Sequence, residues 1–235
     1  MQRGSGFVQR RALASWPLDP AGAPRYPTGM TALYRLDHSA AQIAAQFGAE
    51  AGRDPWAGGL VSPGQFAPVI TAGREAIAGP RQPHQPRRMV PRLWGVPPPP
   101  AAGERGSAVL TVRNPASPFW IGNLRNSEFR CLVPASALMI WGKGVDAHGK
   151  RVRHWLTCTD QPLFAFAAVW KDSEVPGFAL LSAEPNALLR DLGAERMPAI
   201  LSGDPAAWHL WLNGGWDRAQ TLVQPYSSSA MRAGH

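Results

Sequence analysis

The sequence predicts an α+β protein, a single domain with a mixed or antiparallel, barrel-like β core and peripheral helices. Two observations support this class. Short apolar stretches rich in β-forming residues, bounded by Gly, Pro or Asp, dominate residues 107–182. Apolar residues at helical spacing occur outside this region, at 39–47 and after residue 183. The chain shows no internal repeat, and its 235 residues suffice for one large domain.

The first elements are marked by capping residues. We predict a short strand at 33–36 and a helix at 39–47. Asp37 or Ser39 caps the start of this helix, because a side-chain oxygen there can accept a free backbone N–H. Gly48 ends it, since glycine readily adopts the left-handed conformation of a helix C-terminus.

Turn-forming residues dominate the next segment. The pair Pro63-Gly64 predicts a turn between two strands within 60–70. Residues 80–92 are rich in Pro and Arg, which indicates a loop. Its arginines either contact phosphate groups or are simply solvated; they are Arg81, Arg87, Arg88 and Arg92.

The region after residue 107 supplies most of the predicted sheet. We expect strands at Ala108–Val112, Ala137–Trp141, Arg153–Thr157, Leu163–Val169 and Gly177–Leu181. A polar, hairpin-like loop is expected at Gly142–Gly149. Helices are expected at 184–192, 204–213 and 216–222, the first ended by Gly193. The helical spacing of Trp208 and Trp211 favours core positions for these side chains.

Residues 1–29 differ in composition from the rest. They carry four arginines against one acid, Asp19, together with four prolines. Such a segment cannot bury a core, so we expect a disordered basic extension. Met30 offers an alternative start of translation, in which case the extension is a start-site artefact; otherwise it is a basic arm.

The chain carries a formal charge of +8 and a pI near 10.5. A basic surface favours polyanionic partners, because each phosphate contact releases condensed counterions. Only three of its cationic residues are lysines, and arginine suits bidentate phosphate contacts. The alternative is a composition that merely prefers Arg. No apolar run can cross a membrane and no secretory signal is present, so we expect a cytoplasmic or nucleoid-associated monomer.

Cysteine and histidine usage argues against a metal centre. The two cysteines, Cys131 and Cys158, are too few for a disulfide framework. No Cys-x-x-Cys or His-x-x-x-His pair occurs, so we expect neither a structural zinc site nor a cofactor. Both cysteines fall in predicted strands and are expected to be buried and inert.

Five short motifs in order carry a resemblance to a known family. They are Met30-Thr-Ala-Leu-Tyr-Arg35, Leu93-Trp-Gly-Val-Pro97, Thr111-Val-Arg-Asn114, Arg130-Cys-Leu-Val-Pro134 and Arg196-Met-Pro-Ala-Ile-Leu201. Together they resemble the SOS-response-associated peptidases, the abasic-site processing proteins. The resemblance spans about residues 30–232, which we take as the domain.

The resemblance implies a reaction with damaged DNA. In the family, a cysteine that follows the initiator methionine attacks the ring-opened aldehyde of an abasic site in single-stranded DNA. Its amine forms a Schiff base and its thiol closes a thiazolidine ring. An Asn, a Glu and a His support this step.

All four of those positions are altered in this chain. The cysteine position falls on Thr31 and the asparagine on Thr111. The glutamate falls on Ile140, before Trp141, and the histidine falls on Gly193 or on the alanine after it. The resemblance therefore implies a degenerate member with no intact catalytic residue.

The DNA-facing part of the family pattern is retained. Trp94 resembles a family tryptophan that stacks beside the lesion, although a core position is the competing interpretation. Arg113 resembles a family arginine that contacts a phosphate. Weaker candidates for DNA binding are Asn114, Arg35 and Arg88. His154 is expected to be an ordinary packed histidine.

Three functions follow as hypotheses. The first is a protein of the DNA-damage response that binds single-stranded DNA or abasic sites without forming the thiazolidine cross-link. The second is an active cross-linking enzyme that uses Thr31 as an N-terminal nucleophile. The third is a protein-interaction scaffold without DNA binding, which would present Trp208, Trp211 and Trp216 to a partner.

Overall fold

The computed structural model of the chain describes residues 33–73, 85–99, 107–149 and 151–234. The basic extension 1–29 and Thr31 lie outside these residues. The strands are β1 (Leu33–Leu36), β2 (Ala49–Glu50), β3 (Gly59–Val61), β4 (Phe66–Thr71), β5 (Arg87–Trp94), β6 (Thr111–Val112), β7 (Arg130–Ala135), β8 (Ala137–Val145), β9 (Arg151–Cys158), β10 (Phe164–Lys171), β11 (Gly177–Ala183), β12 (Met197–Pro198), β13 (Ile200–Leu201) and β14 (Met231–Gly234). The α-helices are α1 (Ala40–Phe47), α2 (Pro118–Arg125), α3 (Ala187–Leu192), α4 (Pro205–Asn213) and α5 (Trp216–Ala219).

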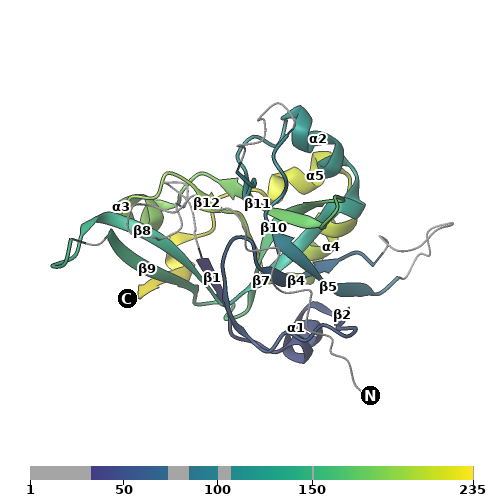
Figure 1. The fold of residues 1–235 in the computed structure, drawn as a ribbon, viewed down its shortest axis with the longest axis horizontal. Coiled ribbons are helices and arrows are strands. Elements are labelled where there is room, and N and C mark those ends of the chain that lie inside the picture. Colours follow the sequence, from purple (N-terminus) through teal and green to yellow (C-terminus); the bar gives the residue numbers. More distant parts are fainter. Residues whose placement is uncertain (1–32, 74–84, 100–106, 150, 235) are drawn as a thin grey trace, which may run out of the picture.

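The strands form two sheets that lie side by side in Figure 1. The first has the order β14-β9-β8-β1-β3, and its described pairings are antiparallel. The second runs β12-β11-β10-β7-β4-β5-β2, with β13 added to β10 and β6 added to β11. The helices lie outside these strands (Figure 1). The predicted α+β class with a barrel-like mixed core is thus confirmed.

The second sheet closes on itself. Strand β5 pairs in parallel with β11 through Leu93–Gly177 and Trp94–Phe178, so β5, β4, β7, β10 and β11 form a ring. The two backbones approach closely at the seam: the Gly95 N–H donates to the Phe178 carbonyl at 2.9 Å. A Cβ atom on Gly177 would lie 3.1 Å from the Gly95 carbonyl carbon and closer still to its oxygen. Only glycine fits this seam without a shift of backbone.

The helix ends follow the capping residues of the sequence. The Ser39 side chain accepts the Gln42 N–H, and the Gln42 side chain accepts the Ser39 N–H at 2.8 Å, which is a reciprocal capping box. Of the two predicted caps, Ser39 is therefore the one used. Gly48 ends α1 at φ 58°, in the left-handed region. Gly193 ends α3 in the same way at φ 97°.

Two local predictions are corrected. The segment 80–92 was expected to be a loop, but residues 87–94 form β5. The strand tolerates Pro91 because this residue lies opposite Pro68 of β4. Since neither proline has an N–H group, no ladder hydrogen bond between the two positions is lost. The expected loop at 142–149 is shorter, since β8 continues to Val145 after an irregular stretch beyond Trp141.

The core is one contiguous cluster of apolar side chains that joins both sheets and the helices. Trp208, Trp211 and Trp216 belong to it, with exposed fractions of 2%, 0% and 9%, which confirms their predicted core positions. The core also contains a charged side chain: Arg130 is fully buried, and its Nη2 donates to the Gly214 carbonyl. Among the described helices, none is long and apolar enough to cross a membrane.

The seam between β5 and β11 gives a first prediction. The substitution Gly177→Ala forces a side chain against the Gly95 carbonyl and should lower the free energy of unfolding by about 1–3 kcal/mol or more. Chemical denaturation followed by tryptophan fluorescence measures this change. Gly215→Ala is the matched control, because no atom lies within 4 Å of a Cβ added there. Equal stability of the two variants would contradict the tight closure.

Candidate functional site

Trp94 ends β5 at the barrel seam and is fully buried. Its ring lies parallel to that of Phe178 at 6.3 Å and tilts against Tyr34 at 5.2 Å. Its indole N–H donates to the Leu110 carbonyl at 3.3 Å. Closure of the barrel therefore places Trp94 in the core, and the expectation of a ring face open to a DNA base is corrected.

Arg113 and Asn114 follow β6 directly, and both side chains are exposed. The Asn114 side chain accepts the Ala116 N–H at 3.0 Å, which forms a tight turn after the strand. The amide of Asn114 is thus partly used by its own loop. The Arg113 guanidinium has no such local bond in this stretch, so it is the freer group of the two for contact with a phosphate.

A polar network fixes the place of Arg113. The Ser182 hydroxyl donates to the Val112 carbonyl at 3.0 Å, which ties β6 to β11. Arg196 donates to the Ser182 carbonyl at 2.9 Å and pairs with Glu184. Arg196, which opens the last sequence motif, thus contacts β11 at the residue that binds β6. Strand β6 carries Thr111, to which the resemblance assigns the asparagine position.

Ile140 lies in β8 and is only 2% exposed. It belongs to the apolar core, so its side chain offers no proton donor or acceptor. In the β8–β9 ladder its partner is His154, which is half-buried. The imidazole also packs on Gly142, where an added Cβ would lie 2.7 Å from the His154 Cδ2. A titratable side chain thus stands across from the altered glutamate position.

Gly193 caps α3 and lies against the side chain of Lys143. A Cβ on Gly193 would be 3.1 Å from the Lys143 Cε and 3.3 Å from its Cδ. The left-handed φ of 97° strains any other residue as well. The backbone conformation therefore disfavours a histidine here, and the Lys143 side chain would have to move aside for one.

Arg35 of β1 is exposed, and its guanidinium carbon lies 5.1 Å from the centre of the Trp155 ring. A second pair of the same kind joins Arg151 to Trp141 at 5.4 Å. Both distances fall within the range of a cation–π contact. The rings therefore hold the two guanidinium groups in place while their N–H groups remain available to solvent.

These pairs lie on one side of the first sheet. Residues that are partners across antiparallel strands point to the same face, and so do residues two apart along a strand. The registers Trp141–Arg153, Met139–Trp155 and Arg35–Ala137 therefore place these side chains together. We call this surface the Arg–Trp face, and it consists of Arg35, Trp141, Arg151, Arg153, Trp155 and Arg232.

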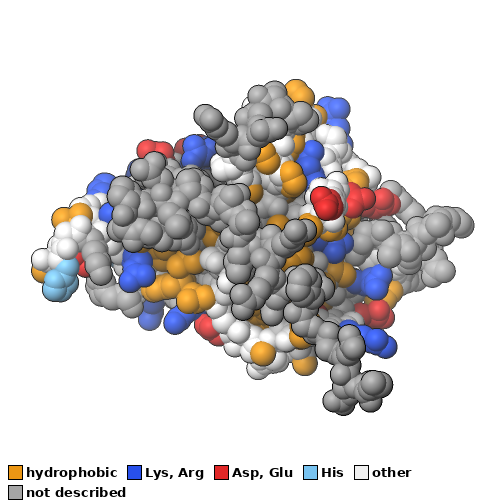
Figure 2. Space-filling model, in the orientation of Figure 1, with side chains coloured by type: hydrophobic (Ala, Val, Ile, Leu, Met, Phe, Trp, Pro, Cys, Tyr) orange, Lys and Arg blue, Asp and Glu red, His pale blue; other side chains and the backbone are white. Residues whose placement is uncertain are grey.

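The Arg–Trp face is strongly positive. Its four arginines are exposed, and no ion pair with a carboxylate involves them among the described residues. Figure 2 shows blue Lys and Arg side chains around hydrophobic ones on the side where Figure 1 places β8 and β9. Phosphates are attracted by such a surface. The structure thus brings Arg35 together with arginines that the sequence analysis did not single out.

Arg88 lies in a different part of the molecule. It is a half-buried residue of β5, opposite Thr71 of β4 and Glu50 of β2. The Thr71 hydroxyl donates to its carbonyl at 3.3 Å. It therefore belongs to a strand rather than to the predicted loop. Its neighbour Arg87 is bound to the Phe47 carbonyl at 2.8 Å, and burial lowers the pKa of that guanidinium.

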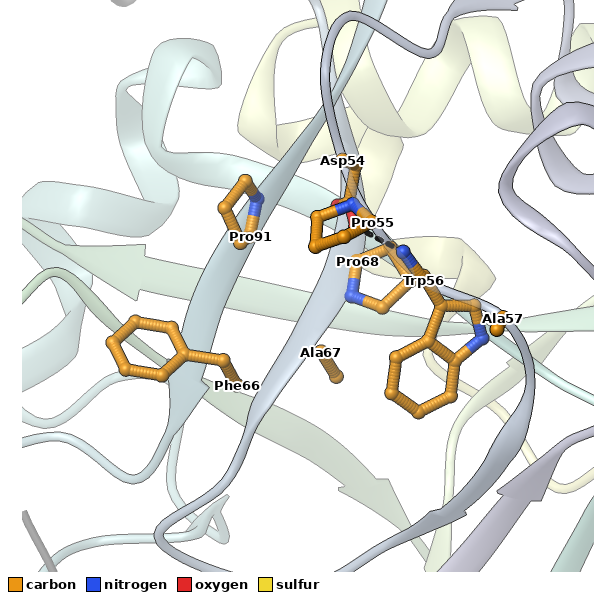
Figure 3. A pocket seen from close by; sticks show the side chains of 8 residues that line it. All are labelled: Asp54, Pro55, Trp56, Ala57, Phe66, Ala67, Pro68 and Pro91. Carbon is orange, nitrogen blue, oxygen red and sulfur yellow. Dashed lines mark hydrogen bonds between the residues drawn. The ribbon is translucent and has the colours of Figure 1, made fainter. Parts of the chain in front are cut away.

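Two pockets lie away from these residues. The first, of about 170 Å³, is apolar and is shown in Figure 3, with Phe66 and Pro91 on one side and Trp56 on the other. Burial raises the pKa of the Asp54 carboxyl, which lines this pocket. The hydrogen bond that this carboxyl accepts from the backbone N–H of Trp56 lowers the pKa by a smaller amount. The second, of about 630 Å³, is lined by both polar and apolar side chains and lies between α1 and the turn before β10. Neither contains a residue predicted from the sequence.

Within the residues that the structure describes, no group of three or more His, Cys, Asp or Glu side chains could hold an ion.

A comparison with protein families matches residues 30–235 to the SOS response associated peptidases (SRAP). The chain belongs to the SRAP family. Its curated relatives include the abasic site processing protein YoqW of Bacillus subtilis (strain 168), which is 30% identical over 111 residues, and the protein of the same name from Bacillus phage SPbeta, with the same identity. The alignment covers 44% of this chain, and the chain spans about half the length of these relatives.

Solved structures share the SRAP-like fold at low identity. A protein from Bacteroides thetaiotaomicron has a TM-score of 0.64 at 18% identity, over 86% of this chain and 90% of that one. A protein from Bordetella bronchiseptica has a TM-score of 0.63 at 18% identity, over 86% and 98%. A phage-related protein from the same species has a TM-score of 0.62 at 14% identity, over 86% and 92%. At these identities the likeness concerns the fold alone.

The two cysteines of this SRAP chain are not accessible substitutes for a reactive thiol. Cys131 is fully buried and Cys158 is 4% exposed. Burial, together with the nearby Asp160 charge, raises the pKa of Cys158 to about 12. At neutral pH this thiol stays protonated, and a thiol is far less nucleophilic than a thiolate.

The sequence did contain a signal for the Arg–Trp face. The run Arg151-Val-Arg-His-Trp155 alternates, which places its two arginines and its tryptophan on one side of a strand. Trp155 itself is half-buried, and the Arg35 guanidinium lies over its ring. No local pattern pointed to Lys143, because its contact with Gly193 joins residues 50 positions apart.

The burial of both thiols gives a second prediction. In the native protein at pH 8, neither Cys131 nor Cys158 should react with a chromogenic disulfide reagent within minutes. Both should react at once after unfolding in guanidinium, because unfolding exposes them and restores an ordinary thiol pKa. A fast-reacting thiol in the folded protein would contradict this assignment and would reopen cysteine chemistry.

Proposed function

We propose that this protein binds single-stranded DNA, including strands with abasic sites, and acts in the DNA-damage response without forming the thiazolidine cross-link. Membership of the SRAP family and the similarity to proteins named for abasic-site processing support a DNA-damage-related role. The Arg–Trp face is the observation that carries the DNA-binding part. It offers four exposed arginines, two of which lie over the rings of Trp141 and Trp155.

The arrangement of this face suits a single strand better than a small ligand. It is an open sheet surface of cations, which can follow a chain of phosphates. The indole rings order the guanidinium groups and leave ring edges beside which bases can pack. No residue of the face reads a base sequence through a fixed pocket, so the affinity should depend on charge and strand length more than on sequence.

Chemistry at the four family positions argues against the cross-link. The described positions carry a hydroxyl, a buried alkyl group and a glycine, at Thr111, Ile140 and Gly193. None of these supplies an acid or base of useful pKa. The two thiols are buried elsewhere. An enzyme that reacts through Thr31 is the alternative, but that residue lies outside the described chain.

The scaffold alternative lacks its main support. It required Trp208, Trp211 and Trp216 on the surface, and all three are buried.

Removal of cations tests the binding surface. The double variant Arg35→Ala/Arg153→Ala should weaken binding to a fluorescent single-stranded oligonucleotide by about tenfold or more at moderate salt. The slope of log affinity against log salt should become shallower by about 0.7 for each phosphate that the variant no longer neutralises. Arg113→Ala should weaken binding to a smaller extent. Fluorescence anisotropy over a salt series measures both quantities.

Arg218→Ala is the control for this experiment, since Arg218 is an exposed arginine on α5, outside the Arg–Trp face. It removes one positive charge and should change affinity little. Equal losses of binding free energy per charge removed, in the control and in the double variant, would show that only overall charge matters, and unchanged affinity in all variants would reject the DNA-binding surface.

A denaturing gel tests the missing cross-link. The protein started at Met1 or at Met30, incubated with an abasic oligonucleotide and no reductant, should give no band that survives heating, because no accessible thiol can close a thiazolidine. A heat-stable band in the chain started at Met30 that disappears in Thr31→Ala would overturn the proposal in favour of N-terminal chemistry.

A further inference from the structure

Lys143 lies against Gly193, one of the two residues to which the family resemblance assigns the histidine position. Its side chain runs along Gly193, with Cε 3.1 Å from the point where a Cβ would stand. The amine is one bond of about 1.5 Å beyond Cε, so it lies within about 5 Å of that point. That is the region in which a side chain of residue 193 would place its functional group.

The fold holds this lysine in place and leaves its amine accessible. Gly193 is fixed by the end of α3, where its N–H donates to the Arg190 carbonyl at 3.0 Å. Lys143 belongs to the irregular stretch of β8, between the ladder pairs at Trp141 and Val145. The residue is exposed. Its stem therefore rests on the helix end while its tip meets solvent.

Other features of the site surround the same strand. Trp141, two residues before Lys143, belongs to the Arg–Trp face. Ile140, the altered glutamate position, precedes it and lies opposite His154. A strand of DNA held on the Arg–Trp face would thus pass close to the end of β8 that carries the amine.

We propose that Lys143 forms a reversible Schiff base with the ring-opened aldehyde of an abasic site. The inference rests on the proposed binding of abasic single-stranded DNA. The neutral amine attacks the C1′ carbonyl carbon, and the carbonyl oxygen takes up a proton to give a carbinolamine. Loss of that hydroxyl as water, with the second amine proton released to solvent, leaves a C=N bond. No oxidant or reductant takes part, and water reverses the step.

Because the described site has no thiol, this adduct should be reversible. A lysine amine has no neighbouring sulfur in its own residue, so the imine cannot close to a ring and remains open to hydrolysis. The protein would then hold a lesion transiently. The imine hydrolyses on heating, so it gives no band on a heated denaturing gel. It becomes permanent when borohydride reduces the C=N bond to an amine.

The other described lysine provides a matched comparison. Lys171 ends β10, and its Nζ lies 4.0 Å from the centre of the Phe119 ring. Burial lowers the pKa of this amine, which favours its neutral form. Burial therefore favours the reactive, neutral amine at Lys171, whereas Lys143 has the advantage in position. The two variants separate these causes.

The test uses the full chain with a single-stranded oligonucleotide that carries one abasic site, in the presence of sodium borohydride. A covalent band should form on a denaturing gel, and mass spectrometry should place the reduced adduct on Lys143. Lys143→Arg should lower the yield at least tenfold, because arginine keeps the charge but forms no imine. Lys171→Arg should leave the yield unchanged.

Binding measured in parallel separates the two proposals. An oligonucleotide with a tetrahydrofuran in place of the abasic sugar has no aldehyde, and Lys143→Arg should bind it as the unaltered protein does. Binding to this strand without a trapped band overturns the Lys143 inference alone. A band that persists in Lys143→Arg, or that maps to Lys150, Lys171 or the N-terminal amine, also overturns it. Failure to bind either oligonucleotide overturns the proposed function, and the Lys143 inference with it.

Discussion

The parallel contact between β5 and β11 is the constraint on which the rest of the structure depends. It turns an open sheet into a ring and requires two backbones to meet at Gly95 and Gly177. The inner side of that seam must be filled, and Trp94 fills it with Phe178. The same strand β11 then holds β6 and, through Ser182, the segment that presents Arg113. Disruption of the seam would therefore displace the candidate site as well as the core.

The altered family positions are built into the surrounding packing. Ile140 is part of the apolar core, where a carboxylate would lose its hydration. Gly193 has a left-handed backbone and a lysine across it, so a histidine would be strained and crowded. Single reversions at these positions would thus disturb the fold before they restored any chemistry.

Local signals predicted much of the fold. The reciprocal cap at Ser39, the glycine at 48 and the glycine at 193 each act over one helical turn, and each lies where the sequence indicates. The strand β5 escaped prediction because its prolines and arginines are typical of loops. Its identity comes from pairing with β4, where two prolines lie opposite one another. Burial of Trp94 likewise depends on ring closure, a contact between residues more than 80 positions apart.

The candidate site was less predictable for the same reason. Arg35 and Arg113 were singled out, and both side chains are exposed. The tryptophan rings that order Arg35 and Arg151 come from other strands, and the register of β8 with β9 brings them into place. Lys143 meets Gly193 only because α3 packs on β8. A family motif transfers residue positions, but it does not transfer the solvent exposure of a ring or the neighbour of a glycine.

The position of strand β14 at a sheet edge has a consequence for self-association of the protein. It pairs with β9 and, within the described residues, forms one of the two edges of the first sheet; unpaired edges tend to join with other edges. Charged side chains discourage such joining, and Arg232 on β14 lies on the Arg–Trp face. The charge that would discourage pairing at this edge is therefore part of the charge of the proposed DNA-binding surface. Once a polyanion neutralises it, the colloidal stability of the protein should decline.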